Sequence, residues 1–288
     1  MSYKIEKLSL ENFPPQLLEI PQPPKSLYIV GKLPPEDSIY LAVIGSRKYT
    51  SYGKEACERL IDGLRGYPIV IVSGLALGID AIAHKAALRA GLTTLAFPGS
   101  GLDARVLYPR SNFPLAEEIL RQGGALISEF EPDFRATEWS FPRRNRIVAG
   151  MCRAVLVVEA PEKSGARITA RLATEYNRDV LAVPGSIFSE SSKGTNILIR
   201  QGATPITKSE DILEALGFEI KEQGEKSKDV YKDCSAEELA VLKLLNEPCA
   251  RDILIRALQK PTHETNTLLS IMEIKGLIKE ELGGIRKC

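Results

Sequence analysis

Three arginines lie within four positions of the stretch FPRRNRIVAG: Arg143, Arg144 and Arg146. Pro142 fits the first turn of a helix, so the arginines are expected near the positive end of a helix dipole, where a cation is mildly unfavourable. An anion held jointly by the guanidinium groups and the free backbone N–H groups would offset that cost. The alternative is that the arginines pair with neighbouring carboxylates. The glutamates concerned are Glu129, Glu131 and Glu138.

A second candidate anion site is the stretch GSRKYTSYG, which follows an apolar run. Gly45 allows close approach of the backbone, Ser46 offers a hydrogen-bond donor, and Arg47 has a rigid planar fork that suits phosphate oxygens. The alternative is a glycine turn with a solvated arginine.

The stretch PGSGLDARVLYPRSNFP combines arginines with an aromatic residue, Phe113. Arg110, Asn112 and Phe113 together suit a single nucleic-acid strand, because phosphates take the charge while a base stacks on the ring for roughly 1–3 kcal/mol. The alternative places Phe113 in the core.

Two further loops suit either an anion or plain structure. In SGLALGID, Gly74 and Gly78 bracket a turn and Asp80 is placed to cap the next helix. A structural turn is favoured here, because the spacing is not that of the GxGxxG dinucleotide-binding motif. In EAPEKSGARITA, Ser164 and Gly165 stand at another expected helix start. His84, in IDAIAHKAAL, is expected to be a packed helix residue, because no nucleophile or carboxylate recurs beside it at helical spacing.

The elements that position these loops alternate in type. Apolar runs rich in valine and isoleucine at 39–45, 68–74, 93–99, 125–130, 154–160 and 179–185 are separated by helical patterns. Strands that are apolar throughout, with crossover-length helices between them, predict a parallel sheet covered on both faces. The fold class is therefore α/β, an extended Rossmann-like, doubly wound and mostly parallel sheet. Ligands of such sheets bind at the carboxyl ends of the strands, where all these loops lie.

Four segments are predicted along the chain. Residues 1–38 form a proline-rich lead-in, extended with one short helical turn, and 39–217 form the Rossmann-like domain. Residues 218–232 are mostly charged and are predicted to form a linker. Residues 233–288 hold three amphipathic helical patterns and a short two-stranded pattern, which indicate a small winged-helix domain. A protein-contact role for this domain is favoured over DNA reading, because its candidate recognition helix has few basic residues.

Composition restricts the function further. Lysine and arginine number 38 against 37 acidic residues, a formal net charge of +1, so any anion site must be local. The five cysteines form no CxxC pair and the two histidines lack metal-ligand spacing, so neither a metal nor a cofactor is expected. The sequence has no secretory signal pattern and no apolar run long enough for a membrane span, so we expect a cytoplasmic protein without membrane contact. Phosphate-binding GxxxxGK[ST] and GxSxG nucleophile motifs are missing, and no catalytic residue is expected.

Taken in order, these loops resemble the DNA-processing protein A family, also called Smf. The matching stretches are GSR at 45–47, SGLALGIDAIAHKAAL at 73–88, GSGLDARVLYPRSN at 99–112, SEF at 128–130, FPRRNRIVAG at 141–150, VVEAPEKSGARITA at 157–170, AVPGS at 182–186 and SSKGTNILIRQGA at 191–203. The ordered set covers about Ile39 to Leu216 and is specific, although each motif alone would be weak. Arg167, Asn177 and Leu77 depart from the more usual family residues.

The resemblance implies a recombination mediator that binds and protects incoming single-stranded DNA and loads a RecA-type recombinase onto it during natural transformation. It also implies a homodimer, whose interface we place near residues 191–217, and no catalytic turnover. In the family, the residues matching Arg47 and Arg110 line the DNA pocket, and Phe113 falls where some relatives place a base-contacting aromatic. The full set predicted to bind single-stranded DNA is Gly45, Ser46, Arg47, Ser73, Gly74, Arg110, Asn112, Phe113, Arg143, Asn145, Arg146, Ser164 and Gly165.

Two other functions stay open. One is a nucleotide-binding or nucleotide-hydrolysing enzyme of the lysine-decarboxylase-like Rossmann group. That group carries PGG-x-GT-x-x-E, whereas this chain has PGSGLD at 98–103, without the second adjacent glycine and the glutamate. The other is an adaptor whose winged helix binds protein partners while the main domain dimerises.

Overall fold

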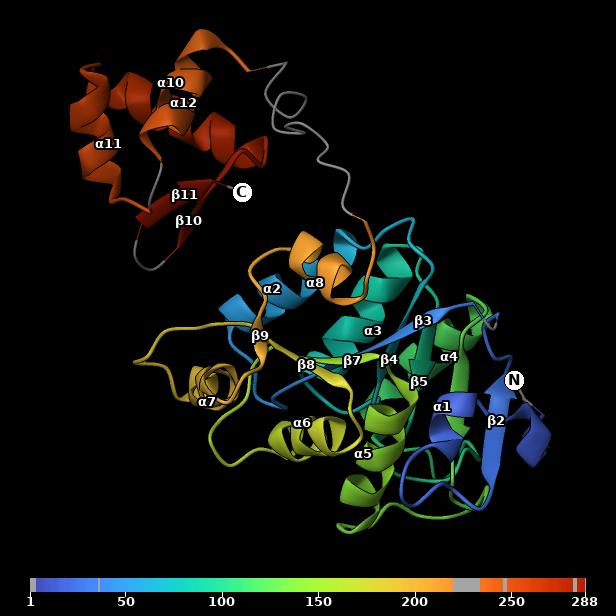
Figure 1. The fold of residues 1–288 in the computed structure, drawn as a ribbon. Helices are drawn as coiled ribbons and strands as arrows, with labels where there is room; N and C mark the ends of the chain where they lie inside the picture. Colours follow the sequence, from blue (N-terminus) through green and yellow to red (C-terminus); the bar gives the residue numbers. More distant parts are fainter. Residues whose placement is uncertain (1–3, 36, 220–233, 246–247, 282–283, 288) are drawn as a thin grey trace. The chain divides into compact units, whose positions relative to one another are not determined.

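The computed structural model describes residues 4–35, 37–219, 234–245, 248–281 and 284–287. The chain divides into two compact units, Met1–Ile220 and Lys221–Cys288. The first unit contains all the candidate loops, and Figure 1 shows its helices lying on both sides of a central sheet.

Within the described residues, the first unit is built on a nine-stranded sheet with the order β1-β2-β6-β5-β4-β3-β7-β8-β9. The strands are β1 (Glu6–Leu8), β2 (Leu27–Gly31), β3 (Ile39–Ile44), β4 (Ile69–Ser73), β5 (Thr94–Ala96), β6 (Ala125–Ser128), β7 (Ala154–Val157), β8 (Asp179–Ala182) and β9 (Thr204–Pro205). All neighbours from β6 to β9 in this order run parallel. Only β2 on β6 and β1 on β2 are antiparallel.

The central strands are apolar at every position because both faces of the sheet are covered. In β3, Leu41 and Val43 pack into the core on one face, while Ala42 and Ile44 pack on the other. One face carries α1 (Pro15–Leu18), α5 (Ser140–Met151), α6 (Gly165–Glu175) and α7 (Lys193–Arg200). The other carries α2 (Ser51–Asp62), α3 (Ile79–Arg89), α4 (Phe113–Arg121) and α8 (Ser209–Ala215). The predicted doubly wound α/β fold is confirmed.

Short 3-10 helices precede three of these elements: η1 (Leu10–Asn12), η2 (Arg110–Asn112) and η3 (Glu190–Ser192). The starts of two long helices are set by hydroxyl caps. Thr50 accepts from the N–H of Gly53 at the start of α2, and Ser164 accepts from the N–H of Ala166 at the start of α6. Both caps lie in candidate loops, so local sequence signals fix where those loops end.

The segment predicted as a lead-in differs from expectation. It contains the expected helical turn, α1, but its run LYIVG forms β2, which pairs along β6 with Ile29 opposite Ile127. Pro24 and Pro34 lie outside this strand and so do not interrupt its hydrogen bonds. The sheet therefore begins before the boundary placed at residue 39.

At the other end of the unit, Phe218 packs edge-on against Tyr67 with ring centroids 5.1 Å apart. Phe218 thus belongs to the first unit, although the charged linker was predicted to begin there. The rest of the predicted linker, from 220 to 232, lies outside the described residues.

The described residues of the second unit form α10 (Ala236–Leu244), α11 (Arg251–Leu258), α12 (Thr262–Ile274) and an antiparallel pair, β10 (Ile278–Glu281) and β11 (Gly284–Lys287). Leu254, Leu269 and Met272 are among the residues buried in its own small core. This is the element order predicted for 233–288, and the winged-helix assignment stays a prediction. No helix in the described part of either unit has the length and apolar content to span a bilayer.

Candidate nucleic-acid interface

The direction of winding reverses between β3 and β7. From β3 the chain continues to β4, β5 and β6 on one side, whereas β7 continues to β8 and β9 on the other. Loops that leave the carboxyl ends of two such neighbouring strands diverge and leave a crevice for a ligand. A cleft of about 380 Å³ lies at this point. Its polar and aromatic lining includes Gly45, Ser46, Arg47, Lys48, Phe141, Arg144, Asn145, Lys163, Ser164 and Gly165.

Arg47 is exposed in this cleft and lies against an aromatic ring. Its guanidinium is 5.1 Å from the ring centroid of Phe141. Phe141 in turn contacts Tyr108, with ring centroids 5.7 Å apart, and Tyr108 is 45% exposed. In the part of the chain that the structure describes, Arg47, Lys48 and Lys163 have no carboxylate partner. Stacking orients the Arg47 fork and leaves its N–H donors for a ligand.

Arg144 lies beneath the cleft and is buried. Its Nη1 donates to the carbonyl oxygens of Gly74, at 2.6 Å, and of Phe97. Burial lowers the pKa of Arg144 to about 10; Asp80 acts in the opposite direction, and the charge of Arg47 lowers the pKa further. Arg47 and Arg144 are therefore close enough for their charges to interact, although Asp80 acts more strongly on Arg144. Arg47, Lys48 and Lys163 supply the exposed positive charge of the cleft.

Gly74 separates Arg144 from the buried carboxylate of Asp80. A Cβ at Gly74 would lie 2.6 Å from guanidinium nitrogens of Arg144 and from Oδ2 of Asp80, so glycine is needed for packing. Asp80 accepts hydrogen bonds from the N–H groups of Gly74, at 3.1 Å, and Ala76, at 3.4 Å. It therefore holds the preceding loop and does not cap α3, whose N-cap is Gly78. Burial raises its pKa, and Arg144 opposes that rise.

The Arg47 loop is held in place by a buried carboxylate, Glu159, which follows β7. Glu159 accepts from the N–H of Thr50 at 2.9 Å and from the Thr50 hydroxyl at 2.5 Å. It also accepts from the hydroxyl of Ser191 at 3.1 Å, and its own carbonyl accepts from the N–H of Ser46 at 2.8 Å. We refer to these contacts as the Glu159 clamp. It ties the loops after β3 and β8 to the end of β7.

Several predicted site residues serve the loops themselves. The Ser46 hydroxyl donates to the carbonyl of Lys48 at 2.6 Å and so forms the turn that presents Arg47. Ser73 is buried, and its hydroxyl donates to the carbonyl of Val43 at 2.7 Å. A Cβ at Gly45 would lie 2.8 Å from the side chain of Ile79, so this glycine allows β3 to pack against α3.

The other two arginines of the opening stretch bind one glutamate. Arg143 pairs with Glu129 at 3.1 Å and Arg146 pairs with it at 2.5 Å. Arg146 also donates to the carbonyl of Gln22 at 2.7 Å, and its side chain is 11% exposed. Both arginines thus pair with a neighbouring glutamate, which was the alternative that the sequence left open. Neither lines the cleft, and their role in DNA binding stays a prediction.

Arg110, Asn112 and Phe113 lie outside the cleft lining. The guanidinium of Arg110 is 4.5 Å from the ring centroid of Phe113, which is half-buried and packs against the core. The Asn112 amide is buried and donates to the carbonyls of Leu75, at 2.8 Å, and Ala76, at 3.1 Å. One face of the Phe113 ring is thus covered by Arg110, and Asn112 supports the loop beside Asp80.

The start of α6 forms the opposite wall. Ser164 caps the helix, as the sequence allowed, and Gly165 is exposed beside it. A Cβ at Gly165 would meet nothing within 4 Å, so packing does not require glycine there. The N–H groups of Ala166 and Arg167 already donate to Ser164, at 3.1 and 3.2 Å. Gly165, which has no side chain, leaves its own N–H at the start of α6 accessible to a close anion.

Sequence reasoning did not select Phe141, Tyr108, Lys163 or Glu159. The first is the aromatic residue directly before Pro142, and Lys163 directly precedes the Ser164 cap. Glu159 is the acidic residue that ends the apolar run VLVVEA. Each of these residues occupies a recognisable position in the sequence, but the partners that give it a role are distant along the chain.

Within the described residues, no three His, Cys, Asp or Glu side chains lie together in a way that could hold a metal ion.

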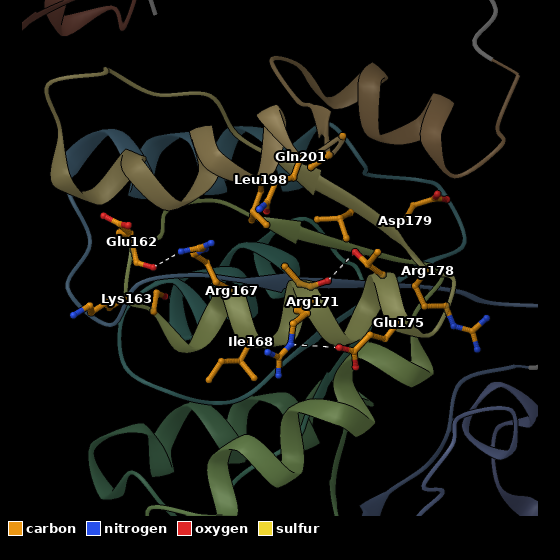
Figure 2. A pocket seen from close by; sticks show the side chains of 16 residues that line it. Glu162, Lys163, Arg167, Ile168, Arg171, Glu175, Arg178, Asp179, Leu198 and Gln201 are labelled. Atoms are coloured by element: carbon orange, nitrogen blue, oxygen red, sulfur yellow. Dashed lines mark hydrogen bonds and ion pairs between the residues drawn. The ribbon is translucent and has the colours of Figure 1, made fainter.

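A larger groove of about 1120 Å³ lies along α6 and α7 (Figure 2). Arg167 donates to the carbonyl of Glu162 at 2.6 Å, and Arg171 pairs with Glu175 at 3.4 Å. Arg167 and Arg171 of α6 are therefore already bonded to neighbours in this groove. Lys163 and Ser164 line both hollows.

Comparison with known proteins gives consistent matches. Residues 5–217 match the family described as DNA recombination-mediator protein A. Protein Smf of Escherichia coli (strain K12) is 38% identical over 280 residues, 95% of this chain and 74% of that protein. DNA processing protein DprA of Streptococcus pneumoniae is 42% identical over 206 residues, 72% of each chain.

Two solved structures share the fold. The X-ray structure of DNA processing protein A from Streptococcus pneumoniae has a TM-score of 0.69 at 39% identity and covers 76% of each chain. A structure of DNA processing protein A from Helicobacter pylori, which concerns its single-stranded DNA binding mode, has a TM-score of 0.67 at 34% identity. It covers 74% of this chain and 96% of the other.

Proposed function

We propose that this chain, which belongs to the DNA recombination-mediator protein A family, binds single-stranded DNA in the cleft between β3 and β7. The observation that carries the proposal is the exposed Arg47 at the topological switch point of the sheet, which stacks on Phe141 and has no ion-pair partner in the region that the structure describes. The Helicobacter relative with 34% identity and the same fold binds single-stranded DNA, which supports the same ligand class here.

In this proposal the phosphates lie between two walls of the cleft. Arg47 and Lys48 contact them from the loop after β3, while Lys163 and the N–H of Gly165 at the start of α6 contact them from the other side. Asn145 lines the same cleft and offers an amide to phosphate or base. Tyr108, half exposed beside Phe141, offers a ring to an unpaired base.

Duplex DNA binds this cleft less well in the proposal, because paired bases are not free to stack on a side chain. Arg110 with Phe113 is proposed as a separate contact at the edge of the α4 loop, where the guanidinium already covers one ring face. Arg143 and Arg146 contribute to DNA binding only if a phosphate replaces Glu129 as their partner.

We further propose the mediator role that the family implies. The chain protects the bound strand and loads a RecA-type recombinase onto it during natural transformation, without catalytic turnover. A homodimer with an interface near residues 191–217 would present two clefts to one strand and so raise the effective affinity. Adding the chain to a recombinase and a strand covered by single-strand-binding protein tests this role, and unchanged recombinase assembly would contradict it.

Fluorescence anisotropy with a labelled oligothymidine and a matching duplex tests the site itself. Arg47→Ala and Lys163→Ala should each weaken single-strand binding several-fold, because each removes an exposed cation that has no carboxylate partner among the described residues. Arg65→Ala is the matched control: Arg65 is exposed but lies beyond the C-terminal end of the 12-residue helix α2. That places it roughly 18 Å along the helix from the Arg47 loop.

Equal losses in all three variants, or a preference for duplex, would overturn the site. The same preparations incubated with nucleoside monophosphates test the enzyme alternative, for which released base is the positive result.

A further inference from the structure

Two apolar side chains lie exposed at the tip of the loop between β8 and α7. Ile187 is 77% exposed and Phe188 is 92% exposed. Figure 1 shows this loop extending away from the sheet before it enters α7. A single exposed apolar residue is ordinary on a protein surface, but two adjacent ones at a loop tip form a patch that core packing does not explain.

The tip is an ordered turn. The N–H of Ser189 donates to the carbonyl of Ser186 at 3.1 Å, and the N–H of Phe188 donates to the Ser186 hydroxyl at 3.3 Å. At the base of the loop, Gly185 exchanges two hydrogen bonds with the Asn196 amide, at 3.3 and 3.0 Å. Local bonds of this kind hold Ile187 and Phe188 outward in a defined geometry.

The turn is tied to the Arg47 loop by two independent contacts. The Tyr52 hydroxyl, at the start of α2, donates to the carbonyl of Pro184 at 2.6 Å. The Glu159 clamp joins Thr50, beside the Arg47 loop, to Ser191, two residues after the turn. The cleft and the Phe188 turn are therefore parts of one connected loop cluster at the carboxyl ends of β3, β7 and β8.

The charges near this cluster favour a polyanion. The turn Ser186–Ser189 has no charged residue, and the next acid, Glu190, pairs with Lys193 at 2.5 Å. The loop that joins the cleft to Tyr52 carries the exposed Arg47 and Lys48, and α2 begins without an acidic residue in its first turn. Its N-terminal N–H groups add positive potential.

Aromatic rings accompany these cations. Tyr49 is 47% exposed and Tyr52 is 49% exposed, and both belong to the path from Arg47 to the turn. Cations along a backbone path with exposed rings beside it are the combination that binds single strands without sequence preference. A protein partner would need only the apolar tip and would not account for the cationic path.

We propose that Phe188 is a base-stacking contact for the part of a single strand that leaves the cleft and passes the start of α2. This inference rests on the proposed function, because it extends the same strand beyond the cleft. Phe188 contacts a base directly, and Tyr52 is a positioning residue that holds the loop base.

The test compares short and long oligothymidines, of about 6 and about 20 nucleotides, by fluorescence anisotropy. Phe188→Ala should weaken binding of the long strand roughly 5- to 160-fold and leave the short strand nearly unchanged. Phe188→Tyr keeps a ring and should restore long-strand binding, whereas Phe188→Leu keeps only the apolar volume and should not. Ile274→Ala, which removes an exposed apolar side chain from α12, is the matched control and should bind as the native chain does.

Light scattering of each variant separates strand stacking from self-association. If Phe188→Leu binds like the native chain, or if Phe188→Ala changes the oligomeric mass, the tip is an apolar contact between proteins and the proposal is wrong. If all Phe188 variants bind both strands normally while Arg47→Ala does not, the stacking proposal fails and the cleft stands. If the native chain binds neither strand, the proposed function fails, and the stacking proposal with it.

Discussion

The salt dependence of single-strand binding measures how many phosphates the cleft contacts. Arg47, Lys48 and Lys163 are the exposed cations of the cleft lining, and they have no carboxylate partner in the described part of the chain. Each phosphate contact contributes about 0.7 to the slope of log affinity against log salt for a single strand. Three contacts predict a slope of about −2, and Arg47→Ala should reduce it to about −1.4. Between 50 and 200 mM salt, the native affinity should fall roughly 20-fold and that of the variant roughly 7-fold.

Arg47→Lys separates charge from shape at the same position. It keeps the cation, so its slope should stay near −2, but it loses the planar fork and the stacking on Phe141. Its affinity should fall by a few-fold at every salt concentration, since a cation over a ring at an exposed site contributes about 0.5–1 kcal/mol. The assay is anisotropy with labelled oligothymidine across the salt series, with Arg65→Ala as the control. A slope unchanged in Arg47→Ala would show that Arg47 contacts no phosphate and would refute the assignment.

Further predictions concern the groups that hold the site. Burial lowers the pKa of His84 from 6.5 to about 3. The contribution of neutral His84 to the free energy of unfolding is therefore complete above pH 6.5. It is lost as the pH falls towards 3, by ~1.4 kcal/mol per pH unit. His84→Gln, which still donates to Thr94, should flatten urea stability between pH 6.5 and 5; parallel pH profiles would contradict this. Glu159→Ala removes three hydrogen bonds from a buried site. It should lower the free energy of unfolding by about 2–4 kcal/mol and weaken strand binding. A variant with native stability and native affinity would exclude a role for the Glu159 clamp. Gly74→Ala should cost about 1–3 kcal/mol because its Cβ meets Arg144 and Asp80, whereas Gly165→Ala, in open space, should stay within ~0.5 kcal/mol; equal urea midpoints would count against this packing.

Much of the fold could be predicted because its signals are local. The apolar runs that became β3 to β8 are buried on both faces, and a run of this kind carries its own signature. β2 was missed because prolines on both sides dominate the segment, while its burial depends on pairing with β6, about a hundred residues later in the chain. Pairing of that kind has no local signal.

The sequence predicted where on the sheet the candidate site lies, but it predicted only some of the residues that line it. Arg47, Asn145, Ser164 and Gly165 were selected from their loops, and the structure brings them to one cleft. Arg47 and Gly165 are exposed, which is consistent with binding a ligand. The Asn112 amide, in contrast, donates to two backbone carbonyls. No pattern of neighbouring residues in the sequence indicates these hydrogen bonds.

The sequence alone determined that this chain forms a doubly wound α/β domain with its polar loops at the carboxyl ends of the strands, because strand polarity and apolar periodicity follow from local order along the chain. Only the tertiary structure decided which arginine is exposed in the cleft. Arg144 is buried on the carbonyls of Gly74 and Phe97, Arg143 and Arg146 share Glu129, and Arg47 alone of these four stacks on Phe141 in the cleft. The four side chains have the same chemistry, and what separates them is the set of partners that folding brings from distant parts of the chain.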